Sequence, residues 1–271
     1  MSSYLAILDH LPAALLVVFR IGGLMIFGPV FGSSVIPVRV RVFTAFAIGL
    51  AAYGLLSSKL HVGEGLKLDL WTLAPLIAME LLIGLVIGYV ASLPMVAVQT
   101  GGLIMGQQMG LGFAQLYNPA IEDEADIIGQ LMFFMALAGF LAIGGHESMM
   151  LAVLNSFEHV QLGGFVPDQS MISLVTGLLM SSLELALRVS APLLALIFLE
   201  TVAMGFLAKT VPQLNILSLG FPIRIMGGLL IVAVGLVVIN DVTMDSVNEA
   251  ITAMFEWIGQ LSPAQGGGSH G

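Results

Sequence analysis

Long hydrophobic runs occupy most of the chain, and short stretches rich in glycine, proline or charge separate them. Because lipid offers the backbone no hydrogen-bond partners, a crossing segment must be helical, and about 20 mostly apolar residues span the hydrocarbon core. Measured against that length, the pattern predicts an all-α membrane protein with about six hydrophobic helices. They lie at about residues 11–27, 42–56, 71–98, 127–143, 171–208 and 217–238.

Helix-breaking residues explain where several of these runs end. Gly28 and Pro37 follow the first run, and residues 57–69 form a mixed polar loop after the short second run. The run at 171–208 is too long for one ordinary crossing. We expect Pro192 either to kink this run or to divide it into two packed helices.

One segment, residues 99–126, fits neither a lipid-facing helix nor a free loop. It reads QTGGLIMGQQMGLGFAQLYNPAIEDEAD, rich in glycine and glutamine, with an acidic cluster at 122–126. Irregular backbone at membrane depth is tolerated only where protein or a water-filled cavity surrounds it. We therefore expect this segment to carry function.

Composition narrows the class of protein further. Hydrophobic residues make up 58% of the 271 residues and charged residues 9%, against about 45–50% and 25% in soluble domains. With 8 basic and 17 acidic residues the formal net charge is −9, which offers no basic surface for nucleic acid. We expect a single membrane domain at 1–260 and a disordered, glycine-rich tail at 261–271.

Several charged side chains lie inside the hydrophobic runs, where each costs roughly 2.5–3.5 kcal/mol on membrane-insertion scales. Arg20 and Glu80 have opposite charge and occupy the first and third predicted helices, so we predict an ion pair that supports assembly. Whether the pair only locks the assembly or also takes part in transport remains open at this point. Arg188 follows Glu184 by four residues, a spacing that suits a local ion pair on a helix.

The chain has 16 methionines, and most of them suit ordinary apolar packing. Met105 and Met109 differ because they lie four residues apart among glycine and glutamine, inside the segment 99–126. Unbranched, polarizable side chains repack easily around varied partners. Two interpretations therefore stand side by side: a packed core, or a ring of methionines that seals a pore and yields to a passing chain.

Residue patterns typical of enzymes are missing from the sequence. There is no cysteine, and His146 with Glu147 lacks the rest of the zinc-protease pattern. No serine is accompanied by a histidine and aspartate arrangement, and no phosphate-binding loop or dinucleotide fingerprint occurs. We therefore predict no enzyme activity, no metal site and no cofactor.

Five motifs, in this order along the chain, resemble those of the FliR family of the flagellar type III export apparatus. They are FRIGGLMIFGPVFGSSVIPVRVR; the series Glu80, Gly84 and Gly88; GLIMGQQMGLGFAQLYNP; IGGHESMMLAVLNSF; and LETVAMGFLAKTVPQLNILSLGFPIR. Each motif alone is modest. The ordered set is specific, and it covers roughly residues 19–228.

The resemblance implies helices arranged as broken helical hairpins within a helical hetero-oligomer, the first part similar to FliP and the last two helices similar to FliQ. It implies a multi-pass subunit of the export gate in the bacterial inner membrane, at the flagellar basal body. The implied partners are FliP, FliQ, FlhB and FlhA, and unfolded flagellar proteins would be the substrates. The resemblance also places the central constriction of the gate within the segment 99–126.

Carried over by position, the candidate constriction residues combine the family motif with the methionine pattern. They are Met105, Gly106, Met109, Gly110, Gly112 and Phe113. The acidic cluster at 122–126 is less typical of the family. These six residues are the sequence-based candidates for a gasket that closes the channel.

Two other functions remain open at the level of sequence. The paralogous subunit of a virulence injectisome would share the fold and mechanism but export different proteins, and the motif GFPIR favours the flagellar subunit. A secondary transporter would also show broken helices and buried glutamates. It would need inverted repeats, however, which the sequence does not show.

Overall fold

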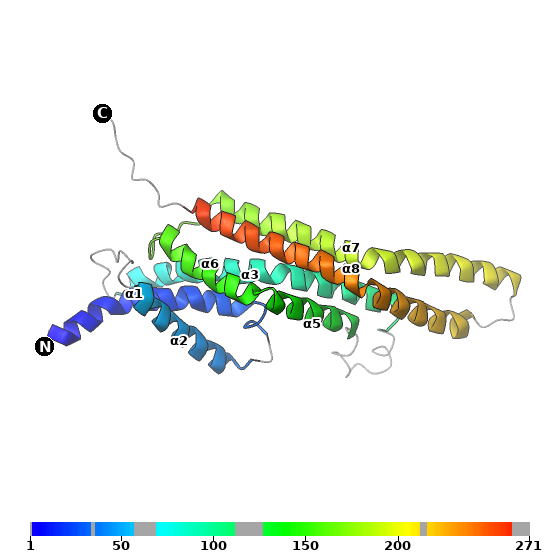
Figure 1. The fold of residues 1–271 in the computed structure, drawn as a ribbon, viewed down its shortest axis with the longest axis horizontal. Helices are drawn as coiled ribbons and strands as arrows, with labels where there is room; N and C mark the ends of the chain where they lie inside the picture. Colours follow the sequence, from blue (N-terminus) through cyan, green and yellow to red (C-terminus); the bar gives the residue numbers. More distant parts are fainter. Residues whose placement is uncertain (1, 34–35, 57–68, 112–126, 212–215, 262–271) are drawn as a thin grey trace, which may run out of the picture. The chain divides into compact units, whose positions relative to one another are not determined.

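The computed structural model describes residues 2–33, 36–56, 69–111, 127–211 and 216–261, and over these residues the chain is helical without strands (Figure 1). Proline and glycine set several helix ends, as the sequence pattern predicts. The helices are α1 (Ser2–Phe27), α2 (Val38–Leu56), α3 (Leu70–Met109), α5 (Ile127–Ala142), α6 (Gly145–His159), α7 (Gln169–Thr210) and α8 (Ile216–Gln260).

Among the described residues, five helices are long and apolar enough to cross a membrane, and the pair α5 and α6 makes a sixth if it is counted as one broken span. This confirms the predicted all-α membrane protein with about six hydrophobic helices. The likeness of its parts to FliP and FliQ, and the hetero-oligomer, stay predictions.

Three predicted runs are parts of longer helices, and the division of one of them into two helices at Pro192 is wrong. α3 continues through Pro94 to Met109, so the first part of the segment 99–126 is helical. α7 is uninterrupted through Pro192. α8 joins the predicted sixth run, 217–238, and the residues that follow it up to Gln260 into one helix. A proline removes one backbone hydrogen bond, and packing along the rest of a long helix offsets that loss.

The helix α2 also begins earlier than predicted, at Val38 directly after Pro37. Proline is well suited to the start of a helix because its φ is already helical and it lacks the amide that would be unsatisfied there. The amide of Arg41 donates to the Pro37 carbonyl at 3.2 Å, which closes the first turn. Both Arg39 and Arg41 therefore belong to the first turns of α2.

Three helices are much longer than a bilayer is thick. α3, α7 and α8 have 40, 42 and 45 residues, which correspond to about 60, 63 and 68 Å of helix. The hydrocarbon core of a membrane measures about 30 Å. Each of these helices must therefore extend beyond the hydrocarbon core, be strongly tilted, or bend.

Contacts divide the chain into two compact units, and α3, α7 and α8 contribute to both. Unit 1 comprises residues 1–92, 144–178 and 249–271, and unit 2 comprises residues 93–143 and 179–248. The expectation of one domain at 1–260 stays a prediction, and residues 262–271 lie outside the described part of the chain.

In unit 1, α1 packs so closely against α3 that backbone meets backbone. A methyl group at Gly84 would overlap the carbonyl oxygen of Arg20 and lie 2.8 Å from the amide of Leu24. One turn later, a methyl group at Gly88 would lie 2.8 Å from the carbonyl oxygen of Leu24. Small residues at this spacing are what close helix approach in membranes requires.

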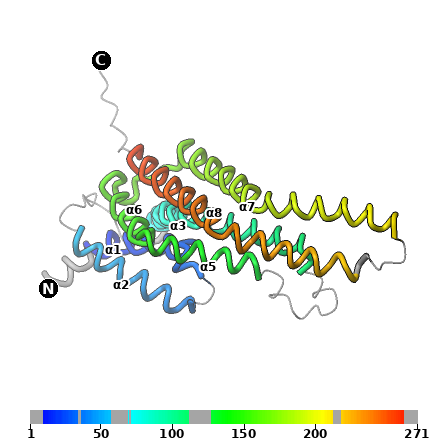
Figure 2. Tube along the Cα trace, turned by 45° about the vertical axis from the view of Figure 1, so that its right-hand side comes forward, coloured from blue at the N-terminus to red at the C-terminus, as the bar shows by residue number. Residues whose placement is uncertain are grey.

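In unit 2, α7 and α8 run side by side as a hairpin, which Figure 1 and Figure 2 show from two directions. Glycines again permit close contacts: a methyl group at Gly101 would lie 2.9 Å from the Ala186 carbonyl oxygen, and one at Gly102 would lie 2.6 Å from the backbone of Gly129. The glycines that suggested irregular backbone in the segment 99–126 therefore serve, at these positions, to pack α3 against α5 and α7.

The start of α7 is fixed by a side-chain cap. The Asp168 carboxylate accepts hydrogen bonds from the Ser170 hydroxyl at 2.7 Å and from the Met171 amide at 3.2 Å. An aspartate before the first helical residue is a preferred cap because it satisfies an amide that the helix leaves unpaired. These bonds, the one from Ser170 first, lower the pKa of Asp168.

Candidate functional site

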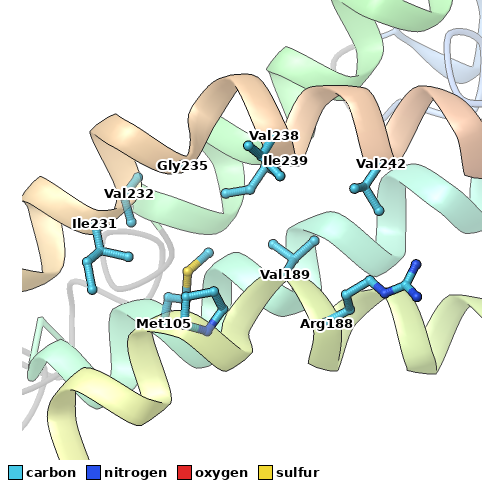
Figure 3. A pocket seen from close by; sticks show the side chains of 10 residues that line it. Met105, Arg188, Val189, Ile231, Val232, Gly235, Val238, Ile239 and Val242 are labelled. Carbon is cyan, nitrogen blue, oxygen red and sulfur yellow. The ribbon is translucent and has the colours of Figure 1, made fainter.

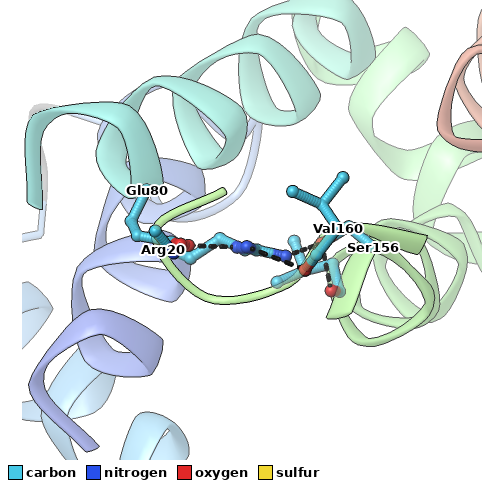
Figure 4. A network of polar contacts seen from close by, with 6 residues as sticks. Arg20, Glu80, Ser156 and Val160 are labelled. Carbon is cyan, nitrogen blue, oxygen red and sulfur yellow. Dashed lines mark hydrogen bonds and ion pairs between the residues drawn. The ribbon is translucent and has the colours of Figure 1, made fainter. Parts of the chain in front are cut away.

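The predicted pair of Arg20 and Glu80 forms the centre of a buried polar network in unit 1 (Figure 4). Arg20 comes from α1 and Glu80 from α3, and both side chains are 0% exposed. The Arg20 Nε donates to the Glu80 Oε2 at 2.5 Å. The structure thus brings these two residues together, as the sequence pattern predicts.

The remaining donors of Arg20 reach α6 and the turn after it. Nη1 donates to the Ser156 Oγ at 3.0 Å and Nη2 to the Val160 carbonyl oxygen at 3.4 Å. The guanidinium carbon lies 4.1 Å from the centroid of the Phe157 ring, a position that favours a cation–π interaction. Arg20 therefore connects α1 and α3 to α6.

Glu80 is held from a second side. Its Oε1 accepts a hydrogen bond from the Gly163 amide at 2.7 Å, while its Oε2 accepts from Arg20. Gly163 has a φ of 74°, a left-handed conformation that favours glycine. The carboxylate thereby fixes the turn after α6 as well as the arginine.

A buried ion pair is costly to desolvate and persists only with good geometry and additional hydrogen bonds. The Arg20–Glu80 pair meets both conditions through Ser156, Val160 and Gly163. Because both side chains are fully buried, any effect on assembly would act through the fold of unit 1. Hydropathy revealed the two charges, but no sequence signal marked Ser156, Phe157 or Gly163 as their partners.

The second predicted site is the C-terminal end of α3 in unit 2, where the candidate constriction residues begin. The Leu111 amide donates to the Gly106 carbonyl oxygen at 3.1 Å, and the Gly110 amide to the Gln107 carbonyl oxygen at 3.0 Å. Gly110 has a φ of 84°. This is a Schellman motif, which ends a helix with a left-handed glycine and redirects the chain.

Met105 and Met109 lie in the core of unit 2, at 1% and 0% exposure. A methyl group at Gly228 of α8 would overlap the Met109 side chain, so this glycine leaves room for the methionine. Met105 lines a cavity of about 240 Å³ with residues of α7 and α8 (Figure 3). Within the single chain these methionines therefore pack, and a role in a pore ring stays a prediction.

The predicted constriction is thus described only in part. Met105, Gly106, Met109 and Gly110 form the last turns and the cap of α3, whereas Gly112 and Phe113 lie outside the described residues. The acidic cluster at 122–126 also lies outside them. What the arrangement establishes is a fixed point, at Gly110, from which the chain enters the segment 112–126.

A second ion pair connects α7 to α8 in unit 2. The Arg224 Nη2 and Nε donate to the Glu200 Oε2 at 2.8 and 3.1 Å, and Nη2 also lies 3.2 Å from the Thr201 hydroxyl. Glu200 lies inside the hydrophobic run 171–208, and this pair was not predicted from the sequence. The signal was available, because the two charges are opposite and lie on either side of the expected turn between the last two helices.

The described part of the chain holds no group of three or more histidine, aspartate or glutamate side chains placed to hold a metal ion. In each of the two ion pairs described above, an arginine contacts a glutamate of another helix. The geometry therefore supports connection of helices, and it does not by itself indicate a reaction.

Comparison with known proteins identifies the family of this chain. The family model described as bacterial export proteins, family 1, matches residues 11–250. The flagellar biosynthetic protein FliR of Bacillus subtilis is 29% identical over 225 residues, covering 81% of this chain and 84% of the relative. FliR of Escherichia coli is 28% identical and covers 79% of this chain and 80% of the relative.

A relative from a virulence system is similar over a shorter region. The Yop proteins translocation protein T of Yersinia pestis is 28% identical over 161 residues, covering 59% of this chain and 62% of the relative. In the described part of the present chain, five helices are long and apolar enough to cross a membrane, which supports a membrane protein. With a family model that matches most of its length, the chain belongs to family 1 of the bacterial export proteins, as its resemblance to the FliR family predicted.

Proposed function

We propose that this chain is a subunit of a bacterial type III protein export gate and that its gate serves the flagellum. The observation that carries the proposal is the match of residues 11–250 to the export family, together with flagellar relatives that cover about four fifths of the chain. The shorter match to the Yersinia protein supports a common type III mechanism. It makes a virulence export gate the alternative.

The exposed surfaces of unit 2 support a role inside an assembly. Large apolar side chains point outward along both helices of the α7–α8 hairpin, among them Phe198, Phe206, Met226 and Val234. Because the helices exceed the thickness of a bilayer, lipid alone does not cover such faces along their whole length. We propose that copies of FliP and FliQ cover them and form the inner-membrane channel with this chain, beside FlhB and FlhA.

We further propose that the end of α3 positions the constriction of the channel. The Schellman motif at Gly110 fixes where and in which direction the chain leaves α3. Gly112 and Phe113 follow directly in the sequence and, in this proposal, form the closing contact together with Met105 and Met109. Unfolded flagellar proteins would pass this point when the gate is open, driven by energy supplied elsewhere in the apparatus.

An export assay tests the proposed function. The gene is deleted in a flagellated host and restored on a plasmid, and flagellar proteins in the culture medium are measured. We expect export to stop on deletion and to return with the intact gene. Normal export of flagellar proteins without the gene would refute the flagellar role, and loss of virulence secretion instead would favour the injectisome.

The constriction is tested by the leakiness of the membrane. Alanine at Gly110 is strained because its φ is 84°, and a left-handed residue of this kind costs roughly 1–2 kcal/mol. We expect Gly110→Ala to misplace the following segment and to let ions leak through the assembled gate. Gly259→Ala is the matched control, since Gly259 lies near the end of α8 in unit 1 with open space around it. Equal ion tightness of the two variants would remove the constriction from the end of α3.

A further inference from the structure

An apolar groove runs between α1 and α2 in unit 1. Its volume is about 550 Å³, within the roughly 300–1,000 Å³ of pockets that hold small ligands. On α1 it extends from Leu11 to Ile26, which is about 22 Å of helix. The rest of the lining is also apolar, with one exception, and includes Phe19, Met25, Val42 and Phe46.

The exception is Arg41, which lines the groove from the first turns of α2. Its Nη2 donates to the Ser33 carbonyl oxygen at 2.8 Å and lies 3.5 Å from the Ile36 carbonyl oxygen. Its Nε is buried and has no hydrogen-bond partner in the described part of the chain. An unsatisfied buried donor of a charged group is expensive and needs an explanation.

We infer that the groove binds an anionic phospholipid, with an acyl chain along α1 and α2 and the phosphate at the guanidinium of Arg41. Such a lipid has both features that the site demands: a long apolar chain for the lining and an anionic phosphate for the one cationic side chain in it. The positive end of the α2 dipole and the exposed Arg39 add attraction for a phosphate. An apolar partner helix would fill the groove but would supply no anion for Arg41, which takes part in neither of the two ion pairs described above.

The groove is open enough for a clean steric test. Gly22 lines it, and no atom lies within 4 Å of a methyl group placed there. A larger side chain at Gly22 therefore points into empty space and competes with a lipid without displacing the protein. Gly177 of α7 is equally open but does not line the groove, so it supplies the control.

Lipid binding is measured by native mass spectrometry on the purified full-length protein, titrated with phosphatidylglycerol or with zwitterionic phosphatidylcholine. We expect preferential retention of phosphatidylglycerol, and a loss of about tenfold in its affinity for Arg41→Gln, which corresponds to about 1.4 kcal/mol. Arg39→Gln is the control for general attraction at the end of α2. Equal losses for Arg39→Gln and Arg41→Gln, or equal retention of the two lipids, would overturn the inference.

Two further variants keep the test independent of the hydrogen bonds that Arg41 makes to the backbone. Gly22→Leu should displace the lipid, while Gly177→Leu should leave its binding unchanged. A photoreactive residue at Phe46 in the assembled complex should form an adduct with a lipid. Lipid binding that survives Gly22→Leu, or an adduct with another protein chain at Phe46, would show that the groove holds something else.

Discussion

Removing one member of the buried ion pair should destabilise unit 1 severely. In Arg20→Met the Glu80 carboxylate keeps the Gly163 amide but loses its only cation among the described contacts. With both side chains 0% exposed, water does not replace the lost partner. Breaking a buried pair in this way costs about 3–5 kcal/mol. At about 2–4 °C per kcal/mol for a chain of this size class, the melting temperature should fall by roughly 10 °C.

The chain provides its own reporter for this experiment. It has two tryptophans, of which Trp257 is 2% exposed and packs edge-on against Phe165 in unit 1, whereas Trp71 is 87% exposed. A Trp71→Phe background therefore leaves one buried tryptophan whose fluorescence follows the unfolding of unit 1. Melting curves in detergent then compare the background protein with its Arg20 and Glu80 variants.

The double variant Arg20→Met, Glu80→Leu separates a stranded charge from lost packing. Removing both charges should restore at least half of the lost stability, because no uncompensated charge remains buried. A charge swap should fail, since a carboxylate at position 20 would face the Val160 carbonyl and the Phe157 ring. A double variant as unstable as Arg20→Met, or a stable swap, would refute the reasoning about the network.

Three further predictions concern other contacts. Gly84→Ala should lower stability by about 1–3 kcal/mol because the methyl group meets backbone, while Gly22→Ala should raise it by about 0.5–1 kcal/mol; thermal melting compares them. Arg224→Met removes a partly exposed ion pair that contributes about 1 kcal/mol to stability. Hydrogen exchange should therefore become faster at the end of α7 and the start of α8. Asp168→Ala should speed exchange at the start of α7. The hydrogen bond from Ser170 lowers the pKa of Asp168 in the folded chain. The stability that the carboxylate contributes is therefore fully present above its ordinary pKa of 3.8, and it is lost as the pH falls through the lower pKa of the folded state.

Much of the fold follows from the sequence because hydrophobic runs in a membrane have few structural solutions. The runs located the long helices, and two isolated opposite charges within them predicted the contact between α1 and α3. The helix ends were harder. Pro192 suggested a kink or a division into two helices, yet α7 continues through it as one helix.

The glycines of the segment 99–126 illustrate why the site is less predictable than the fold. Their number suggested irregular backbone, but Gly101 and Gly102 sit in α3 and let other helices approach. Among the described glycines of this segment, only Gly110 has the left-handed conformation that ends the helix. Sequence alone does not distinguish a glycine that is small from a glycine that is flexible, because both uses depend on the partner across the contact.

The most direct test of the proposed function is the mass of the complex that this chain forms. The chain is purified by an affinity tag after co-expression with the products of its neighbouring genes, and the mass of the intact complex is measured. We predict one copy of this chain together with several copies each of FliP and FliQ. A chain that purifies alone under these conditions, and transports a small solute as a monomer, would contradict the export-gate function.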